Sequence, residues 1–476
     1  MATRVIRSVG IDIGTTTTQV IFSRLELINR APASQVPHYE FSSREITYTS
    51  PVVFTLFDSD GRVCQKGLEA FIRSQYAAAS LTVKEVESGA IIITGETSKA
   101  RNARSTVMDL AGLLGDFVIA TAGPHLESII AGHGSGAGEY SKKRACRVLN
   151  IDIGGGTSNY VVFEAGRVVD TACLNVGGHL IETFSDGGVK SVREPAQRIC
   201  EACFGQRVDP ARLGRRDLDM LTETMAGLIV EVVHGMPSAL ATSLLMTDCL
   251  RPHRRFDQIF ISGGVGECYY HPESAKAPFA YGDTGPLLAE ALRGHEDLAR
   301  ATTQKPRQTL RATVIGAGAY TLSLSGSTIW LNAERLPIRN VPVLQSGLAW
   351  AHAAPDQLAE SWIVAAKRMD LDPVTDLYAL ALPGDIPVMY KEVVAVSGAL
   401  RQFSEHCPNK AHPLIVIAKQ DFGKVLGMEL QPQLTGRELA VIDEVETRDG
   451  DYVDIGKPFF GGQIVPLTVK SLAFPS

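Results

Sequence analysis

The sequence predicts an α/β protein in which one unit is duplicated and a further α/β domain follows at the C-terminus. An apolar run with Asp-Ile-Gly before a turn stands at Val9–Phe22, and the same arrangement returns at Leu149–Phe163. Asp12 and Asp152 hold the same place in the two copies, at an offset of 152 − 12 = 140 residues. Strand-like and helix-like segments alternate again from Val343 onward, which is the βαβ pattern of an α/β domain.

Composition narrows the class of protein. The 476 residues are 45% hydrophobic and 21% charged, which is typical of a globular chain with a large core. A net charge of −6 argues against a dominant nucleic-acid surface. No apolar run approaches the roughly 20 residues of a membrane helix, and the N-terminus leads directly into a strand rather than a signal peptide. Of eight cysteines only Cys200 and Cys203 form a CxxC pair, so we expect reduced thiols and a cytoplasmic protein.

The first lobe is expected to begin with a hairpin. Val5–Ile13 is predicted as a buried strand, Thr18–Leu25 as its antiparallel partner, and the Gly and Thr residues between them as the turn. A basic segment further on fits either a solvated helix face or a contact to phosphate or a partner. The basic residues are Lys99, Arg101 and Arg104. The other elements expected in this lobe are a helix at Leu68–Ala79 and strands at Ser88–Gly95 and Phe117–Ala120.

The second copy is expected to continue into a third strand and then into helices. We expect Arg167–Leu174 to be a strand, the chain from His179 onward to be helical, and Gln258–Ser262 to be a short buried strand. Further helices are expected at Asp217–His234, Glu290–Ala301, Ser361–Met369, Val388–Phe403 and Asp421–Leu430, and further strands at Leu377–Leu382, Leu414–Ala418, Leu439–Val445 and Val465–Leu472. The resulting domains are 1–140, 141–335 and 336–476.

The two hairpins have the chemistry of a nucleotide site. Backbone N–H groups in a tight Gly/Thr turn can hold the phosphates of a nucleotide without the bulk of side chains. Carboxylates beside such anions make sense when a cation lies between them, and Mg²⁺ takes one or two carboxylates together with phosphate oxygens. Asp12 and Asp152 are therefore candidate metal ligands. A single Asp-x-Gly turn is usually only a turn, but here two matched copies occur with a third Gly-Gly element at Gly263-Gly264.

With these motifs in order, the chain resembles the actin, heat-shock chaperone and sugar-kinase superfamily of ATPases. The two hairpins match its phosphate 1 and phosphate 2 motifs, and Ile261–Gly266 matches its adenosine motif. The resemblance implies two actin-like (ribonuclease H-like) lobes, each with a five-stranded sheet, and ATP with Mg²⁺ between them. The nucleotide-binding residues that it implies are Gly14, Thr15, Thr16, Thr17, Gly154, Gly155, Gly156, Thr157, Gly177, Gly178, Gly263, Gly264, Gly266, Gly316 and Gly318.

Within that superfamily the chain is most similar to the reactivating factors of ethanolamine ammonia-lyase, the family that serves ethanolamine utilisation. The likeness covers nearly the whole chain and includes AGPHLESIIAGHG at Ala122–Gly134 and the ending PLTVKSLAFPS. It implies a chaperone-like factor that uses ATP to expel damaged cobalamin from the adenosylcobalamin enzyme, so that intact cofactor can bind. It also leaves room for a homodimer and for association with a bacterial microcompartment, and it implies neither a nucleic-acid nor a membrane partner.

One departure from the superfamily pattern concerns hydrolysis. In heat-shock chaperones and bacterial actins an acidic residue before a proline orients the attacking water, and the matching residue here is Gly123. Glu127 lies one helical turn further on and is the candidate to replace it as a catalytic residue beside Asp12 and Asp152. We therefore expect slow ATP hydrolysis. The alternatives are a small-molecule kinase of the same superfamily, for which no substrate base stands out, and an actin-like filament protein.

Overall fold

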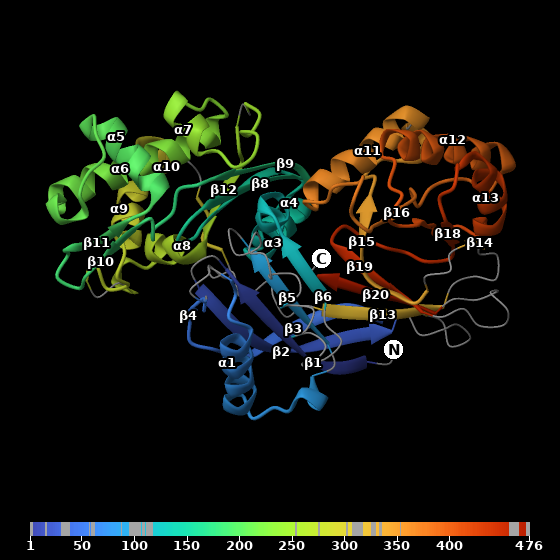
Figure 1. Cartoon of the computed structure of the whole chain (residues 1–476), viewed down its shortest axis with the longest axis horizontal. Helices are drawn as coiled ribbons and strands as arrows, with labels where there is room; N and C mark the ends of the chain where they lie inside the picture. Colours follow the sequence, from blue (N-terminus) through green and yellow to red (C-terminus); the bar gives the residue numbers. More distant parts are fainter. Residues whose placement is uncertain are drawn as a thin grey trace.

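The computed structural model describes most of the chain (Figure 1). The described residues are 3–14, 17–29, 39–56, 58, 62–86, 88–94, 106, 110, 118–252, 255–274, 277–300, 303–306, 318–324, 330–332, 336–352, 354–456 and 466–472. Several residues singled out from the sequence lie outside these ranges, namely Thr15, Thr16, Lys99, Arg101, Arg104 and Gly316.

The first sheet is built around β1. This strand pairs antiparallel with β2 to form the first hairpin and parallel with β5, and the sheet has the order β3-β2-β1-β5-β6 with β4 beside β2. Helix α1 buries Leu68 and Ile72 in the core of this lobe. The elements are β1 (Thr3–Ile13), β2 (Thr17–Asn29), β3 (Tyr39–Thr49), β4 (Val53–Phe54), α1 (Gln65–Ala78), β5 (Ser88–Thr94) and β6 (Val118–Ala122).

The second sheet repeats this plan around β7. The strand pairs antiparallel with β8 and parallel with β12, in the order β12-β7-β8-β9. Within the part of the chain that the structure describes, this sheet has four strands, where the resemblance implies five. The elements are β7 (Arg147–Ile153), β8 (Ser158–Glu164), β9 (Arg167–Leu174), α5 (Glu194–Phe204), α6 (Arg215–His234), α7 (Ala239–Leu244), β12 (Gln258–Ser262), α8 (Gly263–Tyr270), α9 (Gly285–Gly294) and α10 (Glu296–Arg300).

Two expectations for the second lobe are wrong. The chain after His179 forms the small hairpin β10 (Ile181–Thr183) and β11 (Val189–Val192) rather than a helix. Its turn contains Gly187 at a φ of 91°, a conformation that glycine adopts readily. The segment expected as one helix at Glu290–Ala301 contains the end of α9 and the separate short helix α10.

Helices α3 (Pro124–Gly134) and α4 (Ala137–Arg144) connect the lobes. Both pack on the second sheet, where α3 contacts β7, β8 and β9. Leu126 and Ile130 of α3 belong instead to the core of the C-terminal unit. The helix therefore touches the second lobe with one face and the C-terminal unit with another.

The described residues of the C-terminal unit form an eight-stranded sheet in the order β13-β20-β19-β15-β16-β17-β18-β14. Its helices α11, α12 and α13 share one core with the sheet, and β13 contacts β3 and β5 of the first lobe. The elements are β13 (Gly318–Leu324), β14 (Trp330–Asn332), β15 (Ile338–Gln345), α11 (Pro355–Arg368), β16 (Ala379–Ala381), α12 (Tyr390–His406), β17 (Leu414–Ile417), α13 (Gly423–Leu430), β18 (Leu439–Ile442), β19 (Asp451–Ile455) and β20 (Pro466–Leu472).

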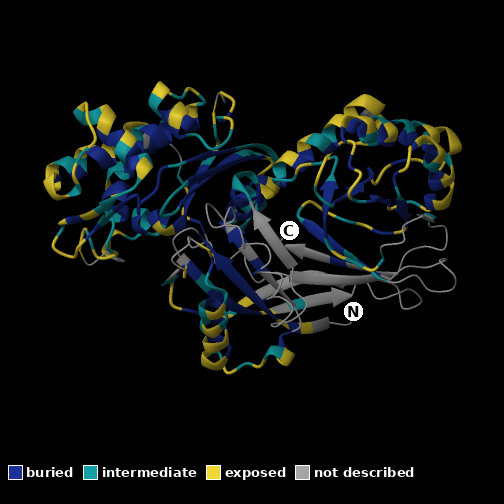
Figure 2. Ribbon diagram, in the orientation of Figure 1, coloured by how far each residue is buried: buried dark blue, intermediate teal, exposed yellow. Residues whose placement is uncertain are grey.

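The duplicated lobes and the additional α/β unit that the sequence predicts are confirmed by these sheets. The proposed domain limits at residues 140 and 335 stay a prediction, because α3 and α4 pack on the second sheet and β13 and β14 join the third. Buried residues follow the strands of the second lobe and the inner faces of its helices, while exposed residues lie on the outer helix faces (Figure 2). Gly14 just after β1 and the turn from Gly154 to Thr157 line the same cavity, which is the candidate functional site.

Candidate functional site

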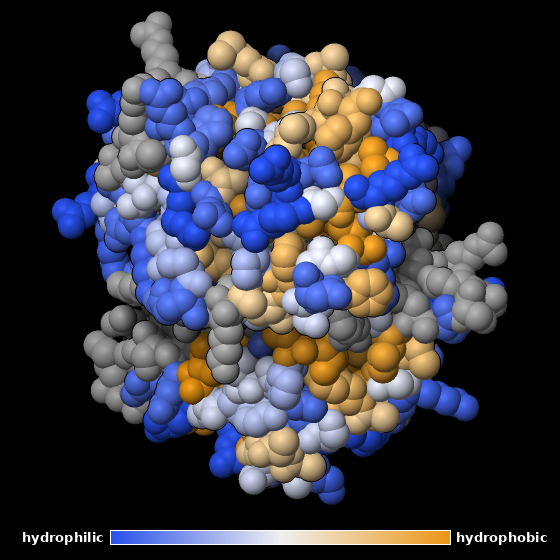
Figure 3. All heavy atoms as spheres, turned by 90° about the vertical axis from the view of Figure 1, so that its left-hand side faces the viewer, coloured by the Kyte–Doolittle hydropathy of each residue, from blue (hydrophilic) through white to orange (hydrophobic). Residues whose placement is uncertain are grey.

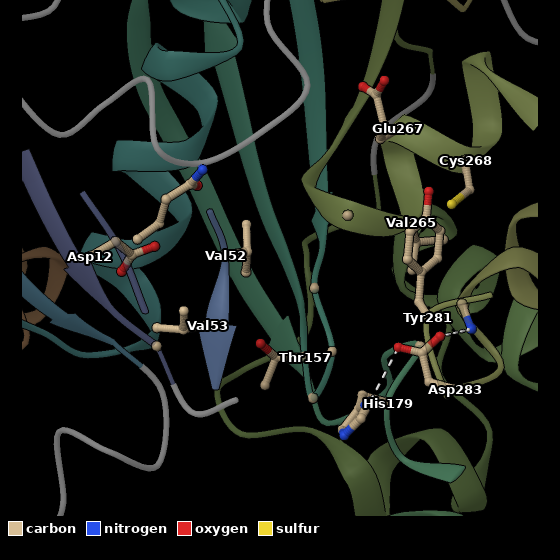
Figure 4. Close-up of a pocket in the computed structure, with 18 of the residues that line it drawn as sticks. Asp12, Val52, Val53, Thr157, His179, Val265, Glu267, Cys268, Tyr281 and Asp283 are labelled. Atoms are coloured by element: carbon tan, nitrogen blue, oxygen red, sulfur yellow. Dashed lines mark hydrogen bonds and ion pairs between the residues drawn. The ribbon is translucent and has the colours of Figure 1, made fainter. Parts of the chain in front are cut away.

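A cavity of about 760 Å³ lies between the two lobes, within the size range of small-molecule sites. Hydrophobic residues gather in a band where the upper and lower halves of the molecule meet (Figure 3). In the close-up, Asp12, Val52 and Val53 face Tyr281 and Asp283 across the cavity (Figure 4). The lining residues are Asp12, Gly14, Gln19, Val52, Val53, Glu127, Gly154, Gly155, Gly156, Thr157, Gly178, His179, Gly264, Val265, Glu267, Cys268, Tyr281, Asp283 and Gly285.

The first hairpin brings a carboxylate to one wall of the cavity. Asp12 is the penultimate residue of β1, lies opposite Gln19 of β2, and is 9% exposed. Gly14 begins the turn, and its carbonyl accepts a hydrogen bond from the Thr55 hydroxyl at 2.7 Å. A bond of 3.1 Å joins the hydroxyls of Thr18 and Thr55, so the segment after β4 holds the base of this turn.

The second hairpin supplies a turn made almost wholly of backbone. The amide of Gly154 donates to the carbonyl of Thr157 at 2.9 Å and closes the turn. The loop after β9 braces it, because the amides of Gly178 and His179 donate to the carbonyls of Gly154 and Gly155 at 2.9 and 2.7 Å. The carbonyls of Gly154 and Gly155 are thus hydrogen-bonded to the loop after β9, while the turn itself lines the cavity. This arrangement is suited to binding an anion through backbone donors.

Asp152 differs from its counterpart in the first lobe. It is 1% exposed and is not among the cavity-lining residues. Its Oδ1 accepts a hydrogen bond of 2.7 Å from the Ser262 hydroxyl, and Asn150 donates to that same hydroxyl oxygen at 3.1 Å. Asp152 therefore belongs to a buried polar network that joins β7 to the end of β12. The expectation that it is a metal ligand stays a prediction.

Glu127 projects from the first turn of α3 into the cavity. The residue is 4% exposed, and its Oε1 accepts a hydrogen bond from the Asn159 amide at 3.0 Å. The same amide nitrogen lies 3.3 Å from the Thr157 hydroxyl. Asn159 stands opposite Asp152 in the β7–β8 ladder, so the second hairpin orients the helix carboxylate as well as the turn.

The segment after β12 forms the opposite wall. Gly263 has a φ of 86°, and a Cβ there would lie 2.3 Å from the carbonyl oxygen of Ile153, so only glycine fits this tight passage from strand to helix. Helix α8 then places Val265, Glu267 and Cys268 against the cavity. This wall offers apolar and sulfur atoms together with a carboxylate, unlike the glycine-rich turn opposite it.

Several lining residues were not found from the sequence. His179 and Asp283 lie 3.2 Å apart (Nδ1 to Oδ2), and Asp283 also accepts from the amide of Gly285 at 2.9 Å. In the sequence, the feature that points to this pair is the position of His179 directly after Gly177-Gly178, and no motif points to Asp283. Tyr281 and Val52 come from irregular segments whose residues carry no recognisable motif. The remaining lining residues outside the sequence-based set are Gln19, Val53, Val265, Glu267, Cys268 and Gly285.

The predicted residues fall into three groups. Those that line the cavity are Asp12, Gly14, Glu127, Gly154, Gly155, Gly156, Thr157, Gly178 and Gly264. Those that lie outside the lining but beside it in the chain or in a neighbouring network are Asp152, Gly177, Gly263 and Gly266, and Thr17 begins β2. Gly318 lies elsewhere, since it begins β13 and pairs with Leu472 in the sheet of the C-terminal unit. We leave Gly318 out of the proposed site.

Among the described residues, no three His, Cys, Asp or Glu side chains form a ligand set of their own. A Mg²⁺ ion that takes one or two carboxylates and completes its shell with phosphate and water does not require such a set. Asp12 and Glu127 both line the cavity and have the hard oxygen ligands that this ion prefers. The residues present therefore fit a magnesium–nucleotide complex. No helix in the described part of the chain has the length and apolar character needed to cross a membrane.

Comparison with known proteins gives full-length matches. The family model described as ethanolamine utilisation protein EutA matches residues 4–475. The chain is 56% identical over 479 residues to the ethanolamine ammonia-lyase reactivase EutA of Escherichia coli (strain K12), with 100% of both chains covered. The protein of the same description from Salmonella typhimurium is also 56% identical over 479 residues, again with 100% of both chains covered.

Solved structures match about two thirds of the chain. An Aquifex aeolicus PPX-GPPA enzyme is 14% identical, with 65% of this chain and 99% of that chain covered and a TM-score of 0.40. The ethanolamine utilization protein EutJ from Carboxydothermus hydrogenoformans is 16% identical, with coverage of 64% and 87% and a TM-score of 0.30. MreB 5 of Spiroplasma citri bound to AMPPNP is 12% identical, with coverage of 66% and 95% and a TM-score of 0.31.

Proposed function

Because the chain belongs to the family of the ethanolamine utilisation protein EutA, we propose that it reactivates ethanolamine ammonia-lyase. In this proposal the protein uses ATP to promote release of damaged cobalamin from the lyase, after which intact adenosylcobalamin binds. The observation that carries the proposal is the 56% identity over the full length of two curated reactivases. A likeness that extends through the C-terminal unit supports the same client as well as the same fold.

The cavity supports ATP as the nucleotide, because its two walls differ in the way that a nucleotide requires. The turn from Gly154 to Thr157 offers backbone donors for phosphates at one end. Val265, Cys268 and Tyr281 offer apolar and aromatic surface for a base at the other. The carboxylates of Glu267 and Asp283 lie along that second wall, where they are suited to accept hydrogen bonds from hydroxyl or amino groups.

We place the metal at the first hairpin. Asp12 would hold Mg²⁺ directly or through water, with Glu127 facing the same space. When bound, the ion neutralises phosphate charge and polarises the phosphoryl group. Asp152 has a supporting role in this proposal, because its contact with Ser262 fixes the end of the strand that leads into the phosphate-binding turn.

Glu127 is the proposed residue that orients the attacking water. Asn159 donates to one of its oxygens, which leaves the carboxylate fixed in direction while it lines the cavity. The carboxylate comes from within the helix rather than from Gly123 before it, so we expect slow turnover without the client. Nucleotide-dependent closure of the lobes would then be a hinge motion, and a client that binds one arrangement better is released as the nucleotide changes. A homodimer and association with a microcompartment stay predictions of the resemblance.

Reactivation of a damaged lyase tests the proposal. Ethanolamine ammonia-lyase that holds inactivated cobalamin is mixed with the protein, free adenosylcobalamin, ATP and Mg²⁺, and deamination of ethanolamine is followed. Activity should return with the complete mixture and stay absent when ATP or Mg²⁺ is omitted. Activity that returns equally without nucleotide, or fails to return with the complete mixture, would contradict the proposal.

A further inference from the structure

The N-terminus of α3 is capped by a residue from the C-terminal unit. The helix begins at Pro124, and Gly123 at the N-cap position has no side chain to satisfy the first amides. Asp370, which lies 370 − 123 = 247 residues further along the chain, satisfies these amides instead. Its carboxylate accepts a hydrogen bond from the amide of Leu126 at 2.7 Å and lies 3.4 Å from the amide of His125. An aspartate is a preferred cap because its charge also complements the helix dipole.

The contact depends on glycine at position 123. A Cβ at that residue would lie 2.4 Å from Cγ of Asp370, so any side chain there would expel the carboxylate. Asp370 itself has a φ of 55°, in the left-handed region that aspartate tolerates better than most residues. Two backbone features, one at each end of the contact, are therefore matched to it.

The same helix turn carries Glu127 into the cavity. Leu126, whose amide donates to Asp370, also packs in the C-terminal core with Trp362 and Met369. The next residue, Glu127, points the other way and is held by Asn159 of the second lobe. One turn of α3 thus lies between the C-terminal unit and the proposed nucleotide site.

The charges agree with this geometry. Burial, opposed by the hydrogen bonds from the amides of Leu126 and His125 and aided by the nearby carboxylate of Glu127, raises the pKa of Asp370 to about 7. The two carboxylates therefore influence each other through the helix turn. A second link between α11 and the second lobe, the Lys367–Asp248 pair at 2.6 Å, is exposed on both sides and contributes little.

We propose that Asp370 is a positioning residue that couples the C-terminal unit to the nucleotide site, by fixing the α3 turn that places Glu127. This inference rests on the proposed function for its consequence in ATP turnover. Movement of the C-terminal unit when it binds a client would move Asp370 with it. The position of Glu127, and with it the rate of hydrolysis, would then respond to the client.

The test compares three variants of the full-length protein. Asp370→Gly removes the cap and accepts the positive φ, while Lys367→Gln removes the exposed ion pair and is the matched control. Gly123→Ser combined with Asp370→Gly supplies a cap from the residue next to the helix and removes only the hydrogen bonds from the α3 amides to the C-terminal unit. The measurements are ATP affinity, ATP turnover with and without lyase, and hydrogen exchange of the α3 amides.

Asp370→Gly should speed exchange of the first α3 amides about fivefold, the factor for loss of a typical cap. It should lower turnover about tenfold with ATP affinity unchanged, because a misplaced catalytic group affects the rate rather than binding. Lys367→Gln should change neither quantity. The double variant should recover slow exchange and basal turnover but not the change in turnover on adding lyase.

Two results would overturn the inference. Unchanged exchange and turnover in Asp370→Gly would show that the residue does not position α3. Full recovery of the response to lyase in the double variant would show that a cap from any source suffices and that no coupling passes through Asp370. Failure of the proposed function is distinguishable, because wild-type protein would then bind no ATP while the exchange measurement still reports on the cap.

Discussion

The two hairpins have the same backbone plan and different side-chain roles. In each, a central strand ends in Asp-Ile-Gly, pairs antiparallel with the next strand and parallel with a later one. Asp12 has Gln19 and Ile92 as its register partners, while Asp152 has Asn159 and Ser262.

On the parallel neighbour strand, the residue paired with Asp152 is Ser262, which has a hydroxyl donor, whereas the residue paired with Asp12 is Ile92. Ser262 ties Asp152 into the buried network, whereas Asp12 lines the cavity. The amides on the other side have also diverged: Asn159 holds Glu127, and Gln19 donates to the carbonyl of Ser50 at 3.2 Å. The two copies thus share the strand order, while the residues beside each aspartate differ, so that Asp12 lines the cavity and Asp152 belongs to a buried network.

The largest expected difference between the copies is in ATP turnover. Asp12→Asn should lower Mg²⁺-dependent turnover at least about 100-fold, the size of effect seen when a charge-stabilising group is removed from a transition state. Asp152→Asn should lower it by about tenfold or less, since its side chain is buried behind the turn. Steady-state hydrolysis over a range of Mg²⁺ concentrations measures both, with thermal unfolding as the control for folding. Equal losses in the two variants would break the distinction drawn here.

The next effect concerns stability. Ser262→Ala removes a hydroxyl that donates to a carboxylate, and we expect a loss of about 1.5–3 kcal/mol in unfolding free energy. Ser158→Ala is the matched control, because its buried hydroxyl donates at 2.8 Å to the neutral carbonyl of Val176, and a loss of about 0.5–1.5 kcal/mol is expected. Denaturant titration compares the two. A control variant that is as destabilised as Ser262→Ala would mean that the charge of Asp152 adds nothing.

The paired amides should differ more modestly. Asn159→Ala removes the donor that orients Glu127, so turnover should fall about tenfold while ATP affinity changes little. Gln19→Ala removes a bond to the Ser50 carbonyl and an amide from the cavity wall but leaves the Asn159–Glu127 contact in place, so a change of about twofold or less is expected. Turnover and ATP affinity are measured separately by steady-state kinetics and calorimetry. A larger loss for Gln19→Ala would reverse the roles of the two hairpins.

The last comparison is a pH dependence that brings in a third buried carboxylate, Asp370. Its pKa of about 7 lies above the ordinary value of 3.8, so the folded state binds the extra proton and this stability is lost as pH rises through 7. The groups that face it are Glu127 on α3 and Tyr452 on β19, together with the capped amides.

Between about pH 4 and 7 the wild type should therefore lose at most about 1.4 kcal/mol per pH unit relative to Asp370→Asn. The difference between their unfolding free energies, measured at several pH values, isolates this group from the other titrating residues. A difference that stays constant from pH 4 to 8 would contradict the raised pKa.

Much of the nucleotide end of the site could be predicted because its residues are contiguous in sequence. The turn from Gly154 to Thr157 and the matching Asp12 can be recognised from local strand and turn patterns alone, without knowledge of the tertiary structure. Tyr281, Asp283 and Val52 could not be predicted in this way, because packing alone brings their irregular segments to the cavity.

Two further differences between expectation and structure have identifiable physical causes, one local and one not. The chain after His179 forms a hairpin instead of the expected helix. The turn sequence Asp186-Gly187-Gly188 between two short β-rich runs is the local pattern that indicates a hairpin. At Gly123, where the sequence lacks the acidic residue of the superfamily pattern, the structure adds the carboxylate of Asp370 in the space that a side chain would need. No local pattern can reveal such a contact between residues so distant in the chain.

The pairing of β13 with β20 has a consequence for biosynthesis. Strand β13 (Gly318–Leu324) is synthesised long before its antiparallel neighbour β20 (Pro466–Leu472), which also pairs with β19 in the same sheet. On the ribosome, both lobes can emerge and collapse while β13 still has an open edge, which is a template for unwanted strand pairing. The nascent protein therefore closes this part of the sheet only after Pro466–Leu472 have been synthesised, and truncation before Pro466 would leave β13 without this partner strand.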